Sequence, residues 1–123
     1  MNIRRMNNGI LEIYDESENF IFSISETIKP KEAASFSFKG ELRKDVTFEF
    51  EDEIMMAMCM CKKIEIDLAD VTYISSDAMM SLNKIKSTAD SKNISVVLKR
   101  VSKAVLDELD ETGVSDLFEI IEK

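Results

Sequence analysis

The amino-acid sequence predicts an α/β protein with a partly parallel sheet. Strand-like and helix-like segments alternate along the second half of the chain, each with the apolar period of its element. Strands that alternate with helices favour βαβ crossovers, which join parallel neighbours. The length of 123 residues and the 45% content of hydrophobic residues suit one domain with its own core, and we expect residues 1–123 to form it.

The N-terminal third is predicted to form antiparallel strands. Residues 10–14 and 20–24 are rich in β-branched and aromatic side chains, and a polar stretch separates them, which indicates a hairpin with a longer loop. Residues 35–40 alternate polar and apolar side chains, as a half-buried strand does. We expect Gly40 to end this strand.

Helices and strands alternate in the middle of the chain. Apolar residues at steps of three and four predict a helix over residues 46–61. Strict alternation then predicts a strand over residues 63–68. A second helical face follows over residues 78–89.

The C-terminal part continues this alternation. The apolar run 94–98 is typical of a strand that is buried on both faces of a sheet. Helical spacing over residues 101–109 leads to Gly113, a residue that suits a left-handed helix end. Residues 117–121 are apolar, and their pattern leaves strand and helix open.

The predicted helix 46–61 is rich in methionine, at positions 55, 56, 58 and 60. These side chains wrap more of the helix than one core-facing stripe requires. An adaptable core helix would explain them, and so would an exposed methionine surface for a partner. The sequence leaves both interpretations open.

Composition excludes several classes of function. Acidic residues outnumber basic ones by 24 to 16, and the net charge of −8 argues against nucleic acid and against an anionic membrane surface as partners. The chain has no histidine and only three glycines, which removes His-based catalysis, Cys–His zinc sites and glycine-rich phosphate loops. Cys59 and Cys61 are expected to be reduced packing residues. We therefore expect no enzyme, no catalytic residue, no metal and no cofactor.

The segment ISSDAMM at residues 74–80 joins a predicted strand to a predicted helix. Serine and aspartate at a helix start accept hydrogen bonds from free N–H groups, so capping would explain Ser75, Ser76 and Asp77. The same place suits an anion, and phosphorylation of an exposed serine there would add about −1.5 to −2 charges without breaking the fold. That charge would block docking of a partner. Capping and switching both remain open at this point.

The longer segment IEIDLADVTYISSDAMMSLNKI resembles the signature region of STAS domains, the family of bacterial anti-sigma factor antagonists. Members of that family typically end a hydrophobic strand with Asp-Leu and open the next helix with Asp-Ser-Ser-Gly-Leu. Here Asp67-Leu68 matches the strand end, and Ser76 takes the place of the phosphorylated serine. The other positions depart from the pattern, with Ser75 for the aspartate, Asp77 for the second serine or threonine, Ala78 for the glycine and Met79 for the leucine.

Two further segments agree with this resemblance. Gly40-Glu41-Leu42 is similar to the family's Gly-Glu-Leu before its first helix, and residues 112–120 are similar to its C-terminal Thr-Gly-Leu and Leu-Phe-x-Ile. The resemblance is strongest over residues 34–121, and the hairpin 10–24 precedes that stretch. It implies a single compact α/β domain with a four- or five-stranded mixed sheet and helices packed against it.

The resemblance also implies a function. A protein-interaction module would bind an anti-sigma factor that is itself an ATP-binding serine kinase, and phosphorylation of Ser76 would end the binding. The partner-binding surface would consist of Glu41, Arg43, Ser75, Asp77, Ala78, Met79 and Met80. The alternative is a STAS-fold scaffold or oligomerisation module without phosphorylation, because Asp77 already places a negative charge beside Ser76. A homodimer is compatible with both, and the expected location is the cytoplasm because no signal peptide or membrane-spanning run is visible.

Overall fold

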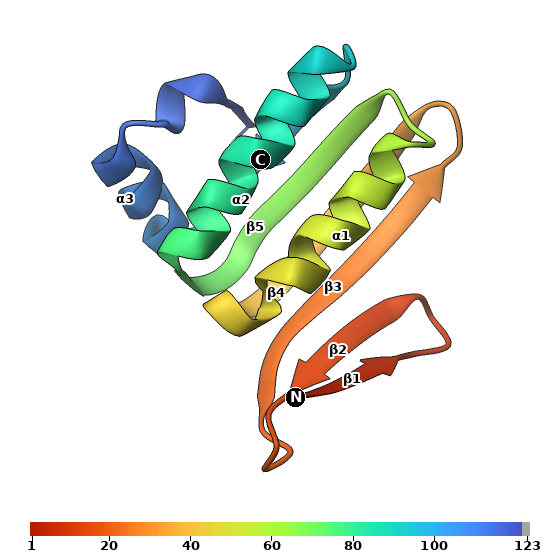
Figure 1. Ribbon diagram of the computed structural model, residues 1–123, viewed down its shortest axis with the longest axis vertical. Coiled ribbons are helices and arrows are strands. Elements are labelled where there is room, and N and C mark those ends of the chain that lie inside the picture. The colour runs from red at the N-terminus through yellow and green to blue at the C-terminus, as the bar shows by residue number, and fades with distance from the viewer. Residues whose placement is uncertain (122–123) are drawn as a thin grey trace.

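Residues 1–121, the part of the chain that the computed structural model describes, form one seven-stranded sheet with helices packed against it (Figure 1). The strands are β1 (Asn2–Arg5), β2 (Ile10–Tyr14), β3 (Phe20–Lys29), β4 (Ala33–Leu42), β5 (Lys63–Ile74), β6 (Ser95–Lys99) and β7 (Glu119–Ile121). The helices are α1 (Thr47–Met58), α2 (Ser76–Ser91) and α3 (Lys103–Thr112), with 3₁₀ turns over Lys44–Val46 and Ser115–Leu117.

The strands lie in the sheet in the order in which they follow along the chain. Neighbours from β1 to β4 pair antiparallel, and neighbours from β4 to β7 pair parallel. Each parallel pair is joined by one of the helices. Right-handed crossovers that advance in one direction place their helices on the same face of a sheet. The helices therefore cover one face, where α1 and α2 lie side by side (Figure 1), and leave the other face open.

The core lies between the sheet and the helices. Phe38 of β4 is at its centre, with ring centroids 5.7 Å from Phe22 and 5.9 Å from Phe36 in stacked arrangements. Phe50 of α1 meets the Phe38 ring edge-on at 5.0 Å. The apolar positions predicted by helical spacing complete this core from α2 and α3, namely Ala78, Leu82, Ile85, Ala89, Val105 and Leu109.

The sheet is wider than the four or five strands that the resemblance implied. The predicted hairpin is present as β2 and β3, but β1 was not predicted, because adjacent arginines interrupt any apolar alternation. Contacts from those arginines hold β1 in place. Arg5 pairs with Glu53 of α1 at 3.0 Å, and the Arg4 guanidinium lies 4.3 Å from the centre of the Tyr14 ring. At the other end of the sheet lie residues 117–121, for which the sequence left strand and helix open. They form the end of a 3₁₀ turn and the strand β7.

Gly40 does not end its strand, contrary to the prediction. β4 continues to Leu42, and Gly40 adopts a φ of +105° within it. A Cβ atom at this position would lie 2.2 Å from the carbonyl oxygen of Ile21 in β3. Glycine is needed here because the backbones of β3 and β4 approach too closely for any side chain. The strand can therefore carry Glu41 onward to the edge of the sheet.

Other element ends also differ from the predictions. β5 continues beyond residue 68 to Ile74, because Val71 and Ile74 add two further buried positions. α1 ends at Met58, before the predicted residue 61. Gly113 adopts the left-handed conformation expected at the end of α3, with φ +73°.

Some methionines of this segment belong to the core, and others are exposed on the surface. Met58 is buried and Met55 packs against the core, whereas Met56 and Met60 are exposed. Both cysteines are free. Cys61 is buried as predicted, but Cys59 is exposed, so the packing role predicted for Cys59 is wrong.

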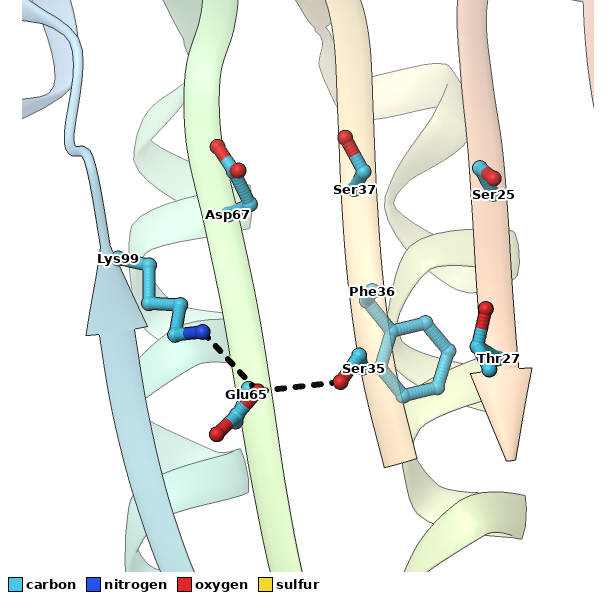
Figure 2. Close-up of a pocket in the computed structure, with 8 residues that line it drawn as sticks. All are labelled: Ser25, Thr27, Ser35, Phe36, Ser37, Glu65, Asp67 and Lys99. Carbon is cyan, nitrogen blue, oxygen red and sulfur yellow. Dashed lines mark hydrogen bonds and ion pairs between the residues drawn. The ribbon is translucent and has the colours of Figure 1, made fainter. Parts of the chain in front are cut away.

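The open face of the sheet is polar (Figure 2). A shallow hollow of about 180 Å³ is lined by Ser25, Thr27, Ser35, Phe36, Ser37, Glu65, Asp67 and Lys99. Glu65 accepts a hydrogen bond from Ser35 at 3.1 Å and pairs with Lys99 at 3.2 Å. Burial alone would raise the pKa of Glu65, but the hydrogen bonds from Lys99 and Ser35 outweigh it and hold the pKa below its ordinary value. Hydroxyls and paired charges explain how this face remains in contact with water.

Candidate functional site

The strand β5 passes into α2 through Ser75. The N–H of Ser75 donates to the carbonyl of Leu42 at 3.0 Å, which ties the junction to the end of β4. Ser75 has extended backbone angles, and its Oγ accepts a hydrogen bond from the Ala78 N–H at 3.1 Å. Both residues are buried. Ser75 is therefore the N-cap of α2, and its hydroxyl already serves the helix.

Ser76 is the first residue of α2 and is exposed. Within residues 1–121 its hydroxyl makes no hydrogen bond. Asp77 follows in the first turn and is also exposed, which suits the positive end of the helix dipole. The two neighbouring serines therefore have different roles: Ser75 caps the helix, and the hydroxyl of Ser76 faces solvent.

Ala78 and Met79 do not belong to the exposed surface. Both side chains are buried, on the face of α2 that contacts the core. Ala78 lies at the same helical spacing as Leu82, so its burial follows from the apolar pattern. Both side chains are buried in the free chain, and the expectation that Ala78 and Met79 bind a partner stays a prediction. Met80, one position further, is exposed.

Glu41 and Arg43 lie beside this junction. Glu41 of β4 pairs in register with Tyr73 of β5, two residues before Ser75. Arg43 is held at 2.9 Å from Asp45 and at 3.8 Å from Glu41. A hollow of about 630 Å³ opens here, lined by Arg43, Lys44, Asp45, Tyr73 and Ser75. The structure therefore brings the two predicted residues of the β4–α1 connection to the start of α2.

The sequence analysis missed two residues of this surface, Phe48 and Tyr73. Phe48 is 74% exposed, Met80 69% and Tyr73 50%, although large apolar side chains are normally buried. Phe48 stands off the helical face formed by Phe50 and its core neighbours, and this offset was a signal in the sequence. The exposure of Tyr73 had no such signal, because it lies within a strand. We define the α2-start surface as Phe48, Tyr73, Ser76, Asp77 and Met80.

A polar contact between α1 and α2 supports this surface. Glu51 accepts a hydrogen bond from Ser81 at 2.8 Å and another from Lys84 at 2.9 Å. Burial alone would raise the pKa of Glu51, but the bonds from Lys84 and Ser81 outweigh it and lower the pKa. Beside this contact, a groove of about 400 Å³ is lined by Thr47, Glu51, Asp77, Met80, Ser81 and Lys84. These contacts of Glu51 join α1 to α2 beyond the first turn of each helix.

The exposed side chains of the α2-start surface include Phe48 in the first turn of α1, Tyr73 near the end of β5 and Met80 of α2. Aromatic and methionine side chains are the types enriched at protein interfaces. Among the residues that the structure describes, no group of three or more His, Cys, Asp or Glu side chains could hold a metal ion. No helix in the same range is long and apolar enough to cross a membrane.

Comparison with known proteins agrees with the fold. The model of the STAS domain family matches residues 11–123. The match takes in nearly all of the β2–β3 hairpin, which precedes the stretch of strongest resemblance, and leaves β1 outside. No curated protein matches the chain.

Several solved structures share the fold. A putative anti-sigma factor antagonist from Thermotoga maritima has a TM-score of 0.74 and 18% identity, covering 81% of this chain and 86% of that chain. The anti-sigma factor antagonist SpoIIAA in its unphosphorylated form has a TM-score of 0.69 and 12% identity, covering 79% and 86%. SpoIIAA of Bacillus in the phosphorylated form has a TM-score of 0.64 and 11% identity, covering 79% and 89%. The family match over nearly the whole chain and this shared fold show that the chain belongs to the STAS domain family.

Proposed function

We propose that this protein is an anti-sigma factor antagonist that binds its anti-sigma factor through the α2-start surface and is released when Ser76 is phosphorylated. The observation that carries the proposal is the division of roles at the helix start. Ser75 is buried and caps α2, while the Ser76 hydroxyl is exposed one residue later. A kinase can therefore reach Ser76 without breaking the cap.

The position of a phosphate on Ser76 explains how phosphorylation would weaken partner binding without unfolding the protein. The N-terminus of α2 favours an anion, so the fold would tolerate the modification. The same charge would lie beside Asp77, which lines a groove with Met80, on the surface that a docked partner would cover in this proposal. An unpaired charge in a buried interface costs roughly 2–5 kcal/mol. At about 1.4 kcal/mol per decade, this is around 30- to 4000-fold in affinity.

The proposed partner is an ATP-binding serine kinase, and the proposed place of action is the cytoplasm. Two findings support the partner. The chain belongs to the STAS family, and SpoIIAA, which shares its fold, is known in unphosphorylated and phosphorylated forms. We propose a binding protein without catalytic activity of its own.

Asp77 favours a second candidate function. It is exposed directly beside Ser76 and makes no ion pair within the described range. Its permanent charge opposes a phosphate on its neighbour and resembles part of the phosphorylated state. The second candidate is a STAS scaffold or oligomerisation module that is not phosphorylated. In that case Ser76→Ala and Ser76→Glu would bind and self-associate alike.

The test compares the wild-type chain with Ser76→Glu and a matched control. Ser87→Glu places the same charge on an exposed position of the same helix, away from its start. Each protein is used to capture partners from lysate of the native host, followed by mass spectrometry, and circular dichroism checks folding. We expect wild type and Ser87→Glu to retain a serine kinase that Ser76→Glu loses. The same partners on all three proteins would refute the switch.

A further inference from the structure

Four lysines gather at one corner of the protein, at the sheet edge opposite the α2-start surface. They are Lys29, Lys31, Lys62 and Lys63, in the β3–β4 turn and at the end of the α1–β5 loop. Backbone hydrogen bonds hold the two loops together, from the Lys31 N–H to the Met60 carbonyl at 2.6 Å and from the Lys62 N–H to the Glu32 carbonyl at 3.0 Å. Figure 1 shows these loops side by side at the upper right. We call these lysines together with Met60 the lysine corner.

The charge of this corner opposes that of the whole chain. Residues 29–33 and 59–63 contain four lysines and one glutamate, a local formal charge of +3 in a chain of net charge −8. All four lysines are exposed. Lys63 pairs with Glu65 at 3.3 Å, whereas the other three make no ion pair with any residue of the described chain. Met60 lies among them with 44% of its surface exposed, so the corner has an apolar centre.

The chain also carries a surface of the opposite charge. Residues 107–119 contain six acidic residues and no basic one. Within residues 1–121, Asp107 pairs with Lys103 and the acids that follow it make no ion pair. Leu117 is 53% exposed between two of them. We define the acidic corner as Asp110, Glu111, Asp116, Leu117 and Glu119.

Both corners lie along the same edge of the sheet. The lysine corner comes immediately before β4 and β5, and the acidic corner leads into β7, which runs parallel to them. Residues that precede parallel strands meet at one edge of the sheet. One strand, β6, lies between β5 and β7 in the sheet. Among the described residues, no ion pair joins the two corners.

We propose that two copies of this chain associate edge to edge, with the lysine corner of each against the acidic corner of the other. A two-fold axis through the middle of the shared edge makes both contacts at once and closes the dimer. Met60 of one copy and Leu117 of the other form the apolar centre of each contact, and the charges form its rim. Complementary charge on the chain itself singles out a second copy, and these contacts must outweigh the repulsion between two chains of net charge −8.

The dimer leaves the α2-start surface free. That surface lies at the ends of β4 and β5, and the corners lie before their starts. Two copies joined in this way present two α2-start surfaces outward, so the assembly is bivalent for whatever partner that surface binds. This inference does not depend on Ser76 or on the identity of the partner, and it can fail while the proposed function holds.

Sedimentation velocity measures the association directly. Ionic strengths of about 0.1 M and about 1 M change the Debye length from about 10 Å, which screens the overall repulsion but not the contacts, to about 3 Å. We expect the wild-type chain to dimerise at the lower ionic strength, at concentrations up to about 1 mM, and to be monomeric at the higher one. A monomer under both conditions would overturn the proposal, and so would a dimer that salt does not weaken.

Charge reversal identifies the surfaces. One variant carries Lys29→Glu, Lys31→Glu and Lys62→Glu, and the other carries Asp110→Lys, Glu111→Lys and Asp116→Lys, which reverses the sign of each corner. Each should be monomeric alone, and an equimolar mixture should form a dimer, because both contacts are again complementary. Lys39→Glu with Lys44→Glu also makes the chain more acidic but lies outside both corners, so it should still dimerise. Failure of the mixture to associate would refute the pairing of the two corners.

A single substitution separates this docking role from folding. Lys31 has a positive φ of 71°, a conformation that glycine adopts without strain. Lys31→Gly should therefore fold at least as stably as the wild-type chain while losing one charge of the lysine corner. We expect weaker dimerisation with an unchanged or higher midpoint of thermal unfolding. Wild-type dimerisation in this variant would count against the lysine corner.

Discussion

Replacing Ser75 with alanine tests whether capping and switching are separate at the start of α2. The substitution removes the oxygen that accepts the Ala78 N–H at 3.1 Å. Ala78 is fully buried, so water cannot replace the lost acceptor without local opening. The paired substitution, Ser76→Ala, removes an exposed hydroxyl that makes no hydrogen bond within residues 1–121. The two variants delete the same atom from neighbouring residues and should differ in stability.

The magnitude follows from the environment of each hydroxyl. Loss of a serine N-cap costs about 0.5–2 kcal/mol of stability. Burial of the orphaned donor moves Ser75→Ala toward the upper half of this range, to about 1–2 kcal/mol. Each kcal/mol shifts the thermal midpoint of a domain of this size by roughly 3–5 °C. Ser76→Ala should stay within about 0.5 kcal/mol of the wild-type chain, as exposed substitutions usually do.

Urea unfolding followed by circular dichroism measures both variants, and amide hydrogen exchange reports on the Ala78 N–H itself. Ser75→Thr is the matched control, because threonine also caps helices and should recover most of the loss. Faster exchange at Ala78 is expected in Ser75→Ala only. If Ser76→Ala lost as much stability as Ser75→Ala, or if Ser75→Ala lost none, the assignment of the cap to Ser75 would be wrong.

Two further predictions concern the sheet. Gly40→Ala places a Cβ atom 2.2 Å from the Ile21 carbonyl oxygen at a φ of +105°, and we expect urea unfolding to show a loss of at least about 2 kcal/mol; a loss below that of Ser75→Ala would contradict the close approach. Burial, and then the nearby Glu53 carboxylate, raise the pKa of Glu26 above its ordinary value of 4.5. A raised pKa favours the folded state below the ordinary value, and this advantage disappears as the pH rises through the raised value. Glu26→Gln should therefore raise the thermal midpoint at about pH 7 and lose that gain near about pH 4. An equal shift at both pH values would show that the charge of Glu26 is not the cause.

Several features of the fold could be predicted from local pattern alone. The spacing of apolar residues in α2 and α3 predicts which of their positions are buried, because one face of a helix repeats every three to four residues. Alternation of polar and apolar residues in β4 predicts its buried phenylalanines, because successive side chains of a strand point to opposite faces. The left-handed Gly113 was predictable because few other residues adopt that conformation readily.

The strands at the two ends of the sheet could not be predicted in this way. β1 has little apolar content, and it forms because Arg5 reaches Glu53 on α1 and Arg4 covers Tyr14.

Gly40 appeared to be a strand end because glycine weakens strands in general. Only the approach of Ile21 from β3 shows why the strand needs a glycine in its interior.

The sequence by itself determined the α/β class, the order of the elements from β2 to α3 and the position of the two serines at a helix start, because periodicity and helix-start chemistry are local properties of the chain. The tertiary structure decided that Ser75 caps α2 while Ser76 is exposed, that Ala78 and Met79 are buried, and that Phe48, Tyr73 and Met80 are exposed. It also decided that lysines and acids far apart in sequence share one sheet edge. Exposure and proximity depend on how the elements pack, and a single segment contains no record of its neighbours in space.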